Sequence, residues 1–326
     1  MKKVHFFTSV SVVLLAIAIV CIGLHQNKAG AIFSVIAFFF AMKEVSKYTS
    51  NYQFFTVFAA AFLTGIALEY PFATFPFLTI VLLFTAACCT TRIVFFSVFS
   101  YTQYSWLEPI LLFCALIFFS IGIFNNHYPI FNILVPIPNI AFSGMITFGI
   151  LKDKKQLMKN VSAKRRVEIG KVPPDFELPD QENKIVKLSD FKEERHLLLI
   201  FVRGDWCPGC HMMLRTYEKS REKFQDKNIF VMAIGPDPVG VNKEMVIKLG
   251  LDFKVLADEK QKTAMAYGVQ LKEYDHAFAE TYKEGIPLPA SFLIDKTGIV
   301  RYVSRPDKVG EFLNPSLIFP IIEQLN

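Results

Sequence analysis

Residues 201–210 decide the fold of the C-terminal half of this chain, and they read Phe-Val-Arg-Gly-Asp-Trp-Cys-Pro-Gly-Cys. The apolar run 197–202 is typical of a buried strand, and the residues after the cysteines have helical spacing. Cys207 therefore lies where a helix begins, and the N–H groups and dipole of that terminus favour a thiolate. Cys210 is near enough to resolve a mixed disulfide formed at Cys207. The motif predicts a redox-active dithiol.

The charge distribution divides the chain at about residue 151. Residues 1–150 contain six Lys or Arg and three Asp or Glu, whereas residues 151–326 contain 29 and 26. We predict an all-α, multi-span membrane domain over 1–150, a basic juxtamembrane linker over 151–171 and a soluble domain over 172–326. The net charge of +6 does not indicate nucleic acid, because the basic excess directly follows the last apolar stretch, where anionic lipid headgroups would meet it. This basic segment is a topology determinant or, alternatively, a specific lipid-binding site.

Six apolar stretches approach the roughly 20 residues that a membrane-spanning helix requires. They cover residues 5–24, 29–45, 53–70, 72–90, 107–124 and 129–150. Lys and Arg in the loops gather on one side, which by the positive-inside rule places both termini in the cytoplasm of a bacterial-type inner membrane. The soluble domain is then cytoplasmic, and a periplasmic domain is the alternative if one helix is miscounted. Segment 93–104 is too short and polar to span and is interpreted as interfacial or re-entrant.

The membrane half contains four cysteines, of which Cys88 and Cys89 are adjacent. They form either a membrane thiol relay or soft-metal pair, or they are small apolar packing residues. Glu108 is an intramembrane acid, which is a functional candidate, or it faces the headgroups. No motif identifies the role of this half, so an anchor, an electron conduit and a transporter stay open.

The second half has the element order of an α/β domain. Strands are predicted at 184–188, 197–202, 229–234, 253–257, 290–294 and 300–303, and helices at 207–224, 241–249, 263–267 and 313–325. Residues 295–298 read Asp-Lys-Thr-Gly and predict a hairpin turn between the last two strands.

Four segments in this order resemble the thioredoxin fold, in the redoxin branch of AhpC/TSA peroxiredoxins and TlpA-like oxidoreductases. The segments are 172–178, 201–210, 255–258 and 289–295, and the resemblance covers about residues 168–326. It implies that Cys207 is an exposed attacking thiolate and that Cys210 resolves the mixed disulfide. It also implies that the Cys207–Cys210 disulfide is the redox group and that there is no other cofactor. It also implies that Pro289 is cis, packs against the dithiol and leaves backbone groups of Leu288 free to pair with a substrate strand.

Supporting roles are assigned to Trp206, Pro208, Gly209, Arg203 and Pro289. The Pro-Gly pair sets the turn and the redox poise. Trp206 is a contact surface beside the sulfur or a packing residue. Arg203 stabilises the thiolate, because a nearby cation favours the charged form, or it is a surface residue. Insert 270–288 lies beside the site, where loops set specificity, and contains His276 as a candidate base.

The family resemblance leaves two redox activities as alternatives. The family's peroxidases carry a Thr or Ser three residues before the reactive cysteine, a Pro seven before it, and a later Arg. This chain has Gly204, Ile200 and Pro289 at those positions, which favours thiol-disulfide exchange. The predicted function is a membrane-anchored oxidoreductase for protein or small-molecule disulfides, with a thiol donor such as thioredoxin. A peroxiredoxin-like antioxidant peroxidase acting on peroxides is one alternative, and a membrane conduit or transporter with a redox-sensing domain is another.

Two further patterns overlap the dithiol. Residues 207–211 fit the C-x-x-C-H pattern of haem c attachment, but a cytochrome would not explain the preceding strand or the Pro289 segment. A structural zinc site would need two more ligands, and His211 is the obvious neighbour.

Overall fold

The computed structural model describes residues 6–48, 51–70, 75–94, 103–126, 128–160, 166–272, 281–304, 315 and 318–325. The chain separates into two compact units. One comprises Met1–Phe95 with Tyr104–Lys152, and the other comprises Phe96–Gln103 with Asp153–Asn326.

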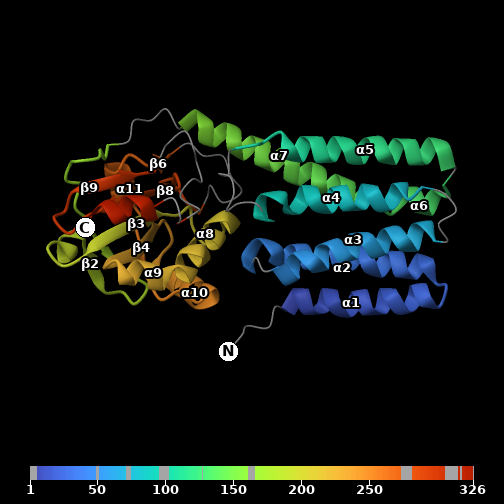
Figure 1. Cartoon of the computed structure of the whole chain (residues 1–326), viewed down its shortest axis with the longest axis horizontal. Coiled ribbons are helices and arrows are strands. Elements are labelled where there is room, and N and C mark those ends of the chain that lie inside the picture. Colours follow the sequence, from blue (N-terminus) through green and yellow to red (C-terminus); the bar gives the residue numbers. More distant parts are fainter. Residues whose placement is uncertain are drawn as a thin grey trace. The chain divides into compact units, whose positions relative to one another are not determined.

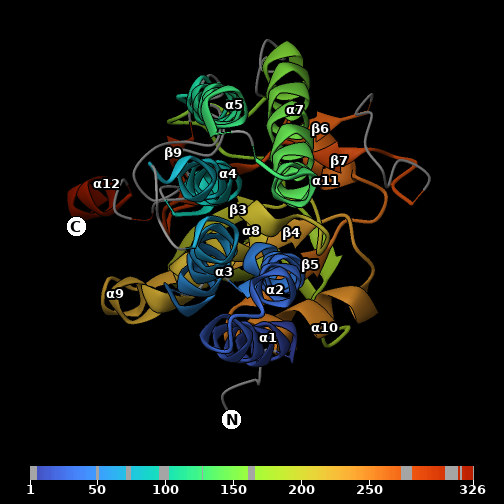
Figure 2. The same ribbon diagram turned by 90° about the vertical axis from the view of Figure 1, so that its right-hand side faces the viewer.

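The first unit is a bundle of apolar helices in which α1, α2, α3, α4 and α5 pack in chain order (Figure 1). The helices are α1 (Phe6–Gly23), α2 (Asn27–Tyr48), α3 (Asn51–Glu69), α4 (Phe77–Val94), α5 (Leu107–Asn126), α6 (Ile130–Leu134) and α7 (Ile137–Asn160). Seen along the helices, α5 and α7 lie on the α4 side of the bundle and α1 lies at the other edge (Figure 2). The predicted stretch 129–150 is thus two helices, because Pro136 has no N–H to continue α6.

Three helical stretches among the described residues are long and apolar enough to cross a membrane. They are Phe6–Gly23, Leu107–Asn125 and Ile130–Met158, and two shorter apolar helices cover Gln53–Glu69 and Phe77–Arg92. The predicted apolar helical domain is therefore present, with three full-length candidate spans. The apolar part of α2 is shortened because Lys43, Glu44 and Lys47 occupy its last turns.

The second unit is built on a five-stranded sheet with the order β5-β4-β3-β8-β9. Its strands are β3 (His196–Phe201), β4 (Ile229–Gly235), β5 (Lys254–Ala257), β8 (Ala290–Ile294) and β9 (Val300–Val303). β3, β4 and β5 are parallel, whereas β8 is antiparallel to both β3 and β9. Every residue of β3 is buried, as its continuous apolar run predicts. The sheet is thioredoxin-like.

Both faces of the sheet are covered. One core contains residues of α8 (Pro208–Lys219), α9 (Arg221–Asp226), α10 (Val239–Leu249) and α12 (Phe319–Ile322). The other contains residues of α11 (Lys262–Ala266) and of the hairpins β1–β2 (Glu177–Pro179, Ile185–Lys187) and β6–β7 (Gln270–Leu271, Ile286–Pro287). The 3-10 turns η1 (Leu188–Phe191) and η4 (Glu323–Leu325) complete the described elements. Alternate side chains of β3 enter the two cores, since Leu198 and Ile200 face one and Leu199 and Phe201 the other.

Three predicted segments are divided, shortened or extended in the structure. The predicted helix 207–224 is divided at Ser220, a residue type whose side chain competes for backbone hydrogen bonds and favours helix caps over helix interiors. The predicted tail helix 313–325 is, within the described residues, the short α12 followed by η4. Helix α7 continues to Asn160, so the first part of the predicted linker 151–171 is helical. Most of segment 93–104, at 95–102, lies outside the described residues.

Candidate active site

The dithiol lies where the loop after β3 enters α8. Cys207 is the N-cap residue of α8, and its Sγ accepts a hydrogen bond from the Cys210 N–H at 3.3 Å. Pro208 occupies the first turn, where its missing N–H costs nothing. The Cys210 thiol donates to Cys207 Sγ at a sulfur–sulfur distance of 2.7 Å, and both thiols are free. The structure therefore brings the two predicted sulfurs together at a helix N-terminus.

Both sulfurs are buried. Cys207 is 1% exposed and Cys210 is 2% exposed, and both belong to the core that α8 closes, with Trp206 packed against it. The prediction of an exposed Cys207 is therefore wrong, because Cys207 lies within this core, against which Trp206 also packs. A substrate reaches Cys207 only if side chains around it move.

The two thiols differ in acidity. Burial raises the pKa of Cys207, but the Cys210 thiol, the Arg203 charge and the Cys210 N–H together lower it to about 6. Burial and the neighbouring Cys207 sulfur raise the pKa of Cys210 well above its ordinary value. At neutral pH Cys207 is a thiolate and Cys210 holds its proton, which is the division of roles that exchange chemistry requires.

Arg203 is a buried residue and not a surface one. Its backbone N–H donates to Cys210 Sγ at 3.4 Å, and its guanidinium lies 5.3 Å from the Trp206 ring centre. Nη1 of Arg203 contacts both carboxylate oxygens of Asp153 at 3.0 and 3.2 Å, in the part of α7 that belongs to the second unit. Arg203 therefore supplies the cation beside the thiolate.

Pro289 is buried at the same edge of the sheet as the dithiol loop. It directly precedes β8, whose first residue Ala290 pairs with Phe201 at the end of β3. The N–H of Leu288 donates to the carbonyl of Val269 at 2.6 Å. The expectation that the backbone groups of Leu288 are free for a substrate strand is therefore wrong for the N–H, because the carbonyl of Val269, just before β6, already accepts from it.

Sequence reasoning missed a polar network behind the dithiol loop. The carboxylate of Asp205 accepts hydrogen bonds from Lys248 Nζ at 2.7 and 2.9 Å and contacts His211 Nε2 at 2.8 Å. Burial raises the pKa of Asp205, but the bonds to His211 and Lys248 lower it to about 2. Asp205 is thus a fixed anion that ties the loop to α8 and α10.

A second carboxylate, Asp237, lies at the carboxyl end of β4. Its Oδ2 accepts from the Asp205 N–H at 2.7 Å, its Oδ1 accepts from the Tyr282 hydroxyl at 2.5 Å, and burial raises its pKa. The neighbouring Gly204 has φ +123°, and a Cβ there would lie 2.9 Å from the Tyr282 oxygen. The sequence signal for Asp237 was its position just after the strand β4. Because β3 and β4 are parallel, residues that follow these two strands lie at the same edge of the sheet.

The candidate base His276 and the rest of 273–280 lie outside the described residues.

The metal and haem patterns do not fit these residues. His211 is buried and its Nε2 contacts Asp205, so the ring is not presented to a haem iron. Within the described parts of the chain, no three His, Cys, Asp or Glu side chains gather as metal ligands.

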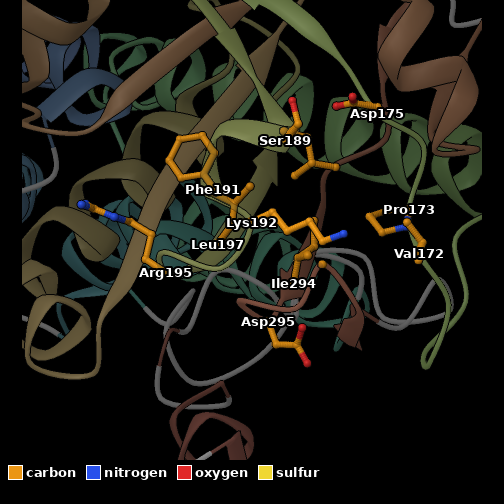
Figure 3. A pocket seen from close by; sticks show the side chains of 12 residues that line it. Val172, Pro173, Asp175, Ser189, Phe191, Lys192, Arg195, Leu197, Ile294 and Asp295 are labelled. Atoms are coloured by element: carbon orange, nitrogen blue, oxygen red, sulfur yellow. The ribbon is translucent and has the colours of Figure 1, made fainter.

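An apolar cavity of about 160 Å³ lies at the other end of β3 (Figure 3). It is lined by Val172, Pro173, Asp175, Leu188, Ser189, Phe191, Lys192, Arg195, Leu197, Ile294, Asp295 and Gly298. Leu197 is near the start of β3, whereas the dithiol follows its end, so this cavity is not part of the dithiol site.

Two cysteines of the helical bundle contact polar groups of α7. Cys88 Sγ lies 3.2 Å from Thr147 Oγ1, and Cys89 Sγ lies 3.4 Å from Ser143 Oγ. Glu108 is fully buried and accepts two hydrogen bonds from Arg92, at 2.6 and 2.9 Å. Glu108 therefore pairs inside the bundle and does not face headgroups.

The soluble domain matches known proteins. Residues 169–303 match the AhpC/TSA family. Peroxiredoxin Bcp of Bacillus subtilis is 34% identical over 152 residues, which cover 45% of this chain and 93% of that protein. The chain belongs to the AhpC/TSA family. The family resemblance read from the dithiol and its flanking segments is thereby confirmed.

Other AhpC/TSA relatives are named for both activities. Thiol-disulfide oxidoreductase ResA of Bacillus cereus is 31% identical over 157 residues, 48% of this chain and 80% of that protein. Chloroplastic peroxiredoxin Q of Triticum aestivum is 31% identical over 153 residues, 45% of this chain; the chain spans 66% of its length, just under two thirds. The crystal structure of peroxidoxin BcpB from Mycobacterium tuberculosis has 20% identity and a TM-score of 0.44, covering 49% of this chain and 99% of that one. The family match over residues 169–303 defines these residues as a redoxin domain.

Proposed function

We propose that this protein is a membrane-anchored thiol-disulfide oxidoreductase in which Cys207 attacks and Cys210 resolves. One observation carries the proposal: two thiols at the start of α8 lie 2.7 Å apart and have opposite pKa shifts. A lowered pKa makes the first sulfur a nucleophile at neutral pH, and a raised pKa keeps the second protonated until it is needed.

The exchange proceeds in two displacements. The Cys207 thiolate attacks one sulfur of a substrate disulfide, a mixed disulfide forms, and the other substrate sulfur leaves as a thiolate. Cys210 then loses its proton and attacks the Cys207 sulfur, which releases the second substrate sulfur and leaves a Cys207–Cys210 disulfide. A thiol donor such as thioredoxin returns the two electrons, and no other cofactor is required.

Peroxide reduction is the second candidate function. The buried Arg203 beside the Cys207 thiolate and the peroxiredoxin names of several relatives favour it. Against it, Gly204 offers no hydroxyl three residues before Cys207, and Ile200 lies inside β3. Exchange is therefore the main proposal.

The test uses the full chain in detergent with Cys207→Ser and Cys210→Ser variants. We expect the wild type to reduce insulin disulfides, Cys207→Ser to be inactive, and Cys210→Ser to accumulate a mixed disulfide that thiol reductants release. Faster consumption of hydrogen peroxide than of any disulfide would make the peroxidase the main activity. No turnover of either substrate would contradict the proposal that this protein is an enzyme.

The membrane half has a proposed arrangement and a proposed role. Six spans with the redoxin domain in the cytoplasm follow from the charge bias of the loops. For the alternative topology, in which electrons must cross the membrane to reach the redoxin domain, Cys88 and Cys89 are proposed as a membrane thiol relay; each sulfur contacts a polar side chain of α7. Replacing both with Ala should then change the oxidised fraction of Cys207–Cys210 in cells, measured by thiol trapping. An unchanged fraction would make them packing residues.

A further inference from the structure

Arg203 favours the Cys207 thiolate only while its guanidinium stays beside the sulfur. The charge of Arg203 and a hydrogen bond from its side chain both lower the pKa of Cys207. Both effects weaken with distance, and an arginine side chain gives up much rotamer entropy when it is held in one conformation. The thiolate therefore depends on the groups that hold the guanidinium in place.

Asp153 and Trp206 both contact this guanidinium. Nη1 of Arg203 lies 3.0 and 3.2 Å from the two carboxylate oxygens of Asp153, and the guanidinium carbon lies 5.3 Å from the Trp206 ring centre. The side chains of Arg203 and Asp153 are only 9% and 16% exposed. Water and salt screen a partly buried ion pair much less than an exposed one, so the carboxylate is a firm charged anchor for Arg203.

The fold of the second unit fixes Asp153 in turn. Asp153 lies in the part of α7 that belongs to this unit. Leu157 lies one helical turn further along α7 and on the same face, because residues four apart on a helix are neighbours. Leu157 is fully buried in the core that also contains Phe201, the last residue of β3. The burial of Leu157 therefore holds the face of α7 that presents Asp153 to Arg203.

We propose that Asp153 positions the Arg203 guanidinium beside Cys207, so that a residue of helix α7 completes the dithiol site. This inference rests on the proposed exchange, in which Cys207 attacks as a thiolate. Asp153 acts through Arg203, which makes it a positioning residue and not a catalytic one. Because α7 begins in the first unit, one continuous helix joins the apolar bundle to the residue that holds Arg203.

The alternative is that Asp153 acts only as a nearby negative charge. A carboxylate close to a thiolate disfavours it, so loss of the charge alone lowers the pKa of Cys207, whereas release of Arg203 raises it. Two substitutions separate these effects because their signs are opposite. Asp153→Asn removes the charge but keeps a carbonyl oxygen that can accept from Arg203 Nη1, whereas Asp153→Ala removes both.

The test measures the pH dependence of Cys207 alkylation by iodoacetamide in the full-length protein in detergent, with mass spectrometry to assign the label to Cys207. We expect the midpoint to rise by about half a pH unit or more in Asp153→Ala and to stay in place or fall in Asp153→Asn. In an Arg203→Met background, Asp153→Ala should raise the midpoint no further, because a residue that acts through Arg203 has no such effect without it.

The control variant is Asp226→Ala, which removes an exposed carboxylate at the end of α9 and should leave the midpoint where it is in the wild type. Should Asp153→Ala fail to fold, Asp153→Ser takes its place, because its side chain is one atom shorter than that of Asp153.

Three results would overturn the inference. They are a midpoint that falls in Asp153→Ala as in Asp153→Asn, a midpoint that does not move in Asp153→Ala, and an equal rise with and without Arg203. The proposed function stands after any of them if the wild type reduces insulin disulfides. A wild type that reduces no disulfide contradicts the proposed function, whereas the rise in Asp153→Ala would still show that Asp153 positions Arg203.

Discussion

At the scale of single residues, Cys207 and Cys210 differ because only Cys207 caps a helix. Its sulfur accepts a hydrogen bond from the Cys210 N–H and lies near the Arg203 charge, whereas the Cys210 thiol donates a hydrogen bond to Cys207 Sγ. The lowered pKa of Cys207 means that its thiolate fraction rises with pH through about 6. We therefore expect the rate of Cys207 alkylation by iodoacetamide to rise with a midpoint near pH 6.

Arg203→Met should move that midpoint upward, because the variant removes a cation that favours the thiolate. Arg203→Lys keeps a positive charge and should recover part of the shift. A midpoint that stays in place in Arg203→Met would show that the helix terminus and Cys210 alone set the acidity of Cys207.

The residue that reacts was predictable from sequence, and its surroundings were not. Two cysteines three residues apart after an apolar run reveal the dithiol, since the signal is local. Asp237, Lys248 and Tyr282 come from three different segments, and tertiary contacts such as the parallel pairing of β3 with β4 and the pairing of β6 with β7 bring them to Asp205 and Gly204. The burial of Cys207 likewise depends on packing from distant elements.

At the scale of elements, the strands were predicted best. The predicted strands 290–294 and 300–303 coincide with β8 and β9, and the predicted strand 197–202 is displaced by one residue from β3. A buried strand leaves a continuous apolar run, which sequence displays directly. The division of the predicted helix 207–224 at Ser220 was missed, because apolar spacing continues through it.

The turn between β3 and α8 depends on Gly204. Its φ of +123° is strained for any residue with a side chain, and an added Cβ would meet Tyr282, Asp237 and Trp206 at 2.9–3.1 Å. We expect Gly204→Ala to destabilise the fold by about 1–3 kcal/mol. Gly209→Ala is the control, because no described atom lies within 4 Å of its added Cβ and alanine favours a helix.

Thermal unfolding of the full-length protein in detergent checks this expectation. A lower Tm for Gly204→Ala beside an unchanged or higher Tm for Gly209→Ala supports the close approach at the loop. Equal Tm values for the two variants would contradict it.

Helices α4 and α5 are joined by the buried Arg92–Glu108 ion pair. Glu108→Gln leaves the Arg92 guanidinium in the bundle without its carboxylate, and breaking a buried pair in this way typically costs about 3–5 kcal/mol. The control is Glu182→Gln, which breaks an exposed pair with Lys243 worth under about 1 kcal/mol. We expect thermal unfolding in detergent to shift strongly for the first variant only, and similar shifts would contradict a structural role for the buried pair.

At the scale of the whole molecule, the chain joins an apolar helical bundle to a redoxin domain of the AhpC/TSA family. In the proposed membrane-anchored protein, the side of the membrane on which that domain lies decides its chemistry. In a reducing cytoplasm soluble donors reach the dithiol directly, whereas an oxidising compartment would require electrons to cross the membrane half. The proposed relay through Cys88 and Cys89 has a purpose chiefly in the second case.

Single introduced cysteines can determine that side. Lys28 is exposed in the first turn of α2 and Lys243 is exposed in α10, and neither is near the dithiol sulfurs in sequence. In a chain whose own six cysteines are replaced by Ala, we expect Lys28→Cys in intact cells to react with a membrane-impermeant maleimide. Lys243→Cys should react only with a permeant maleimide, because the proposed topology, which follows from the positive loop charges, has the redoxin domain in the cytoplasm. Reaction of Lys243→Cys with the impermeant reagent would reverse the topology and make the membrane half the route for electrons.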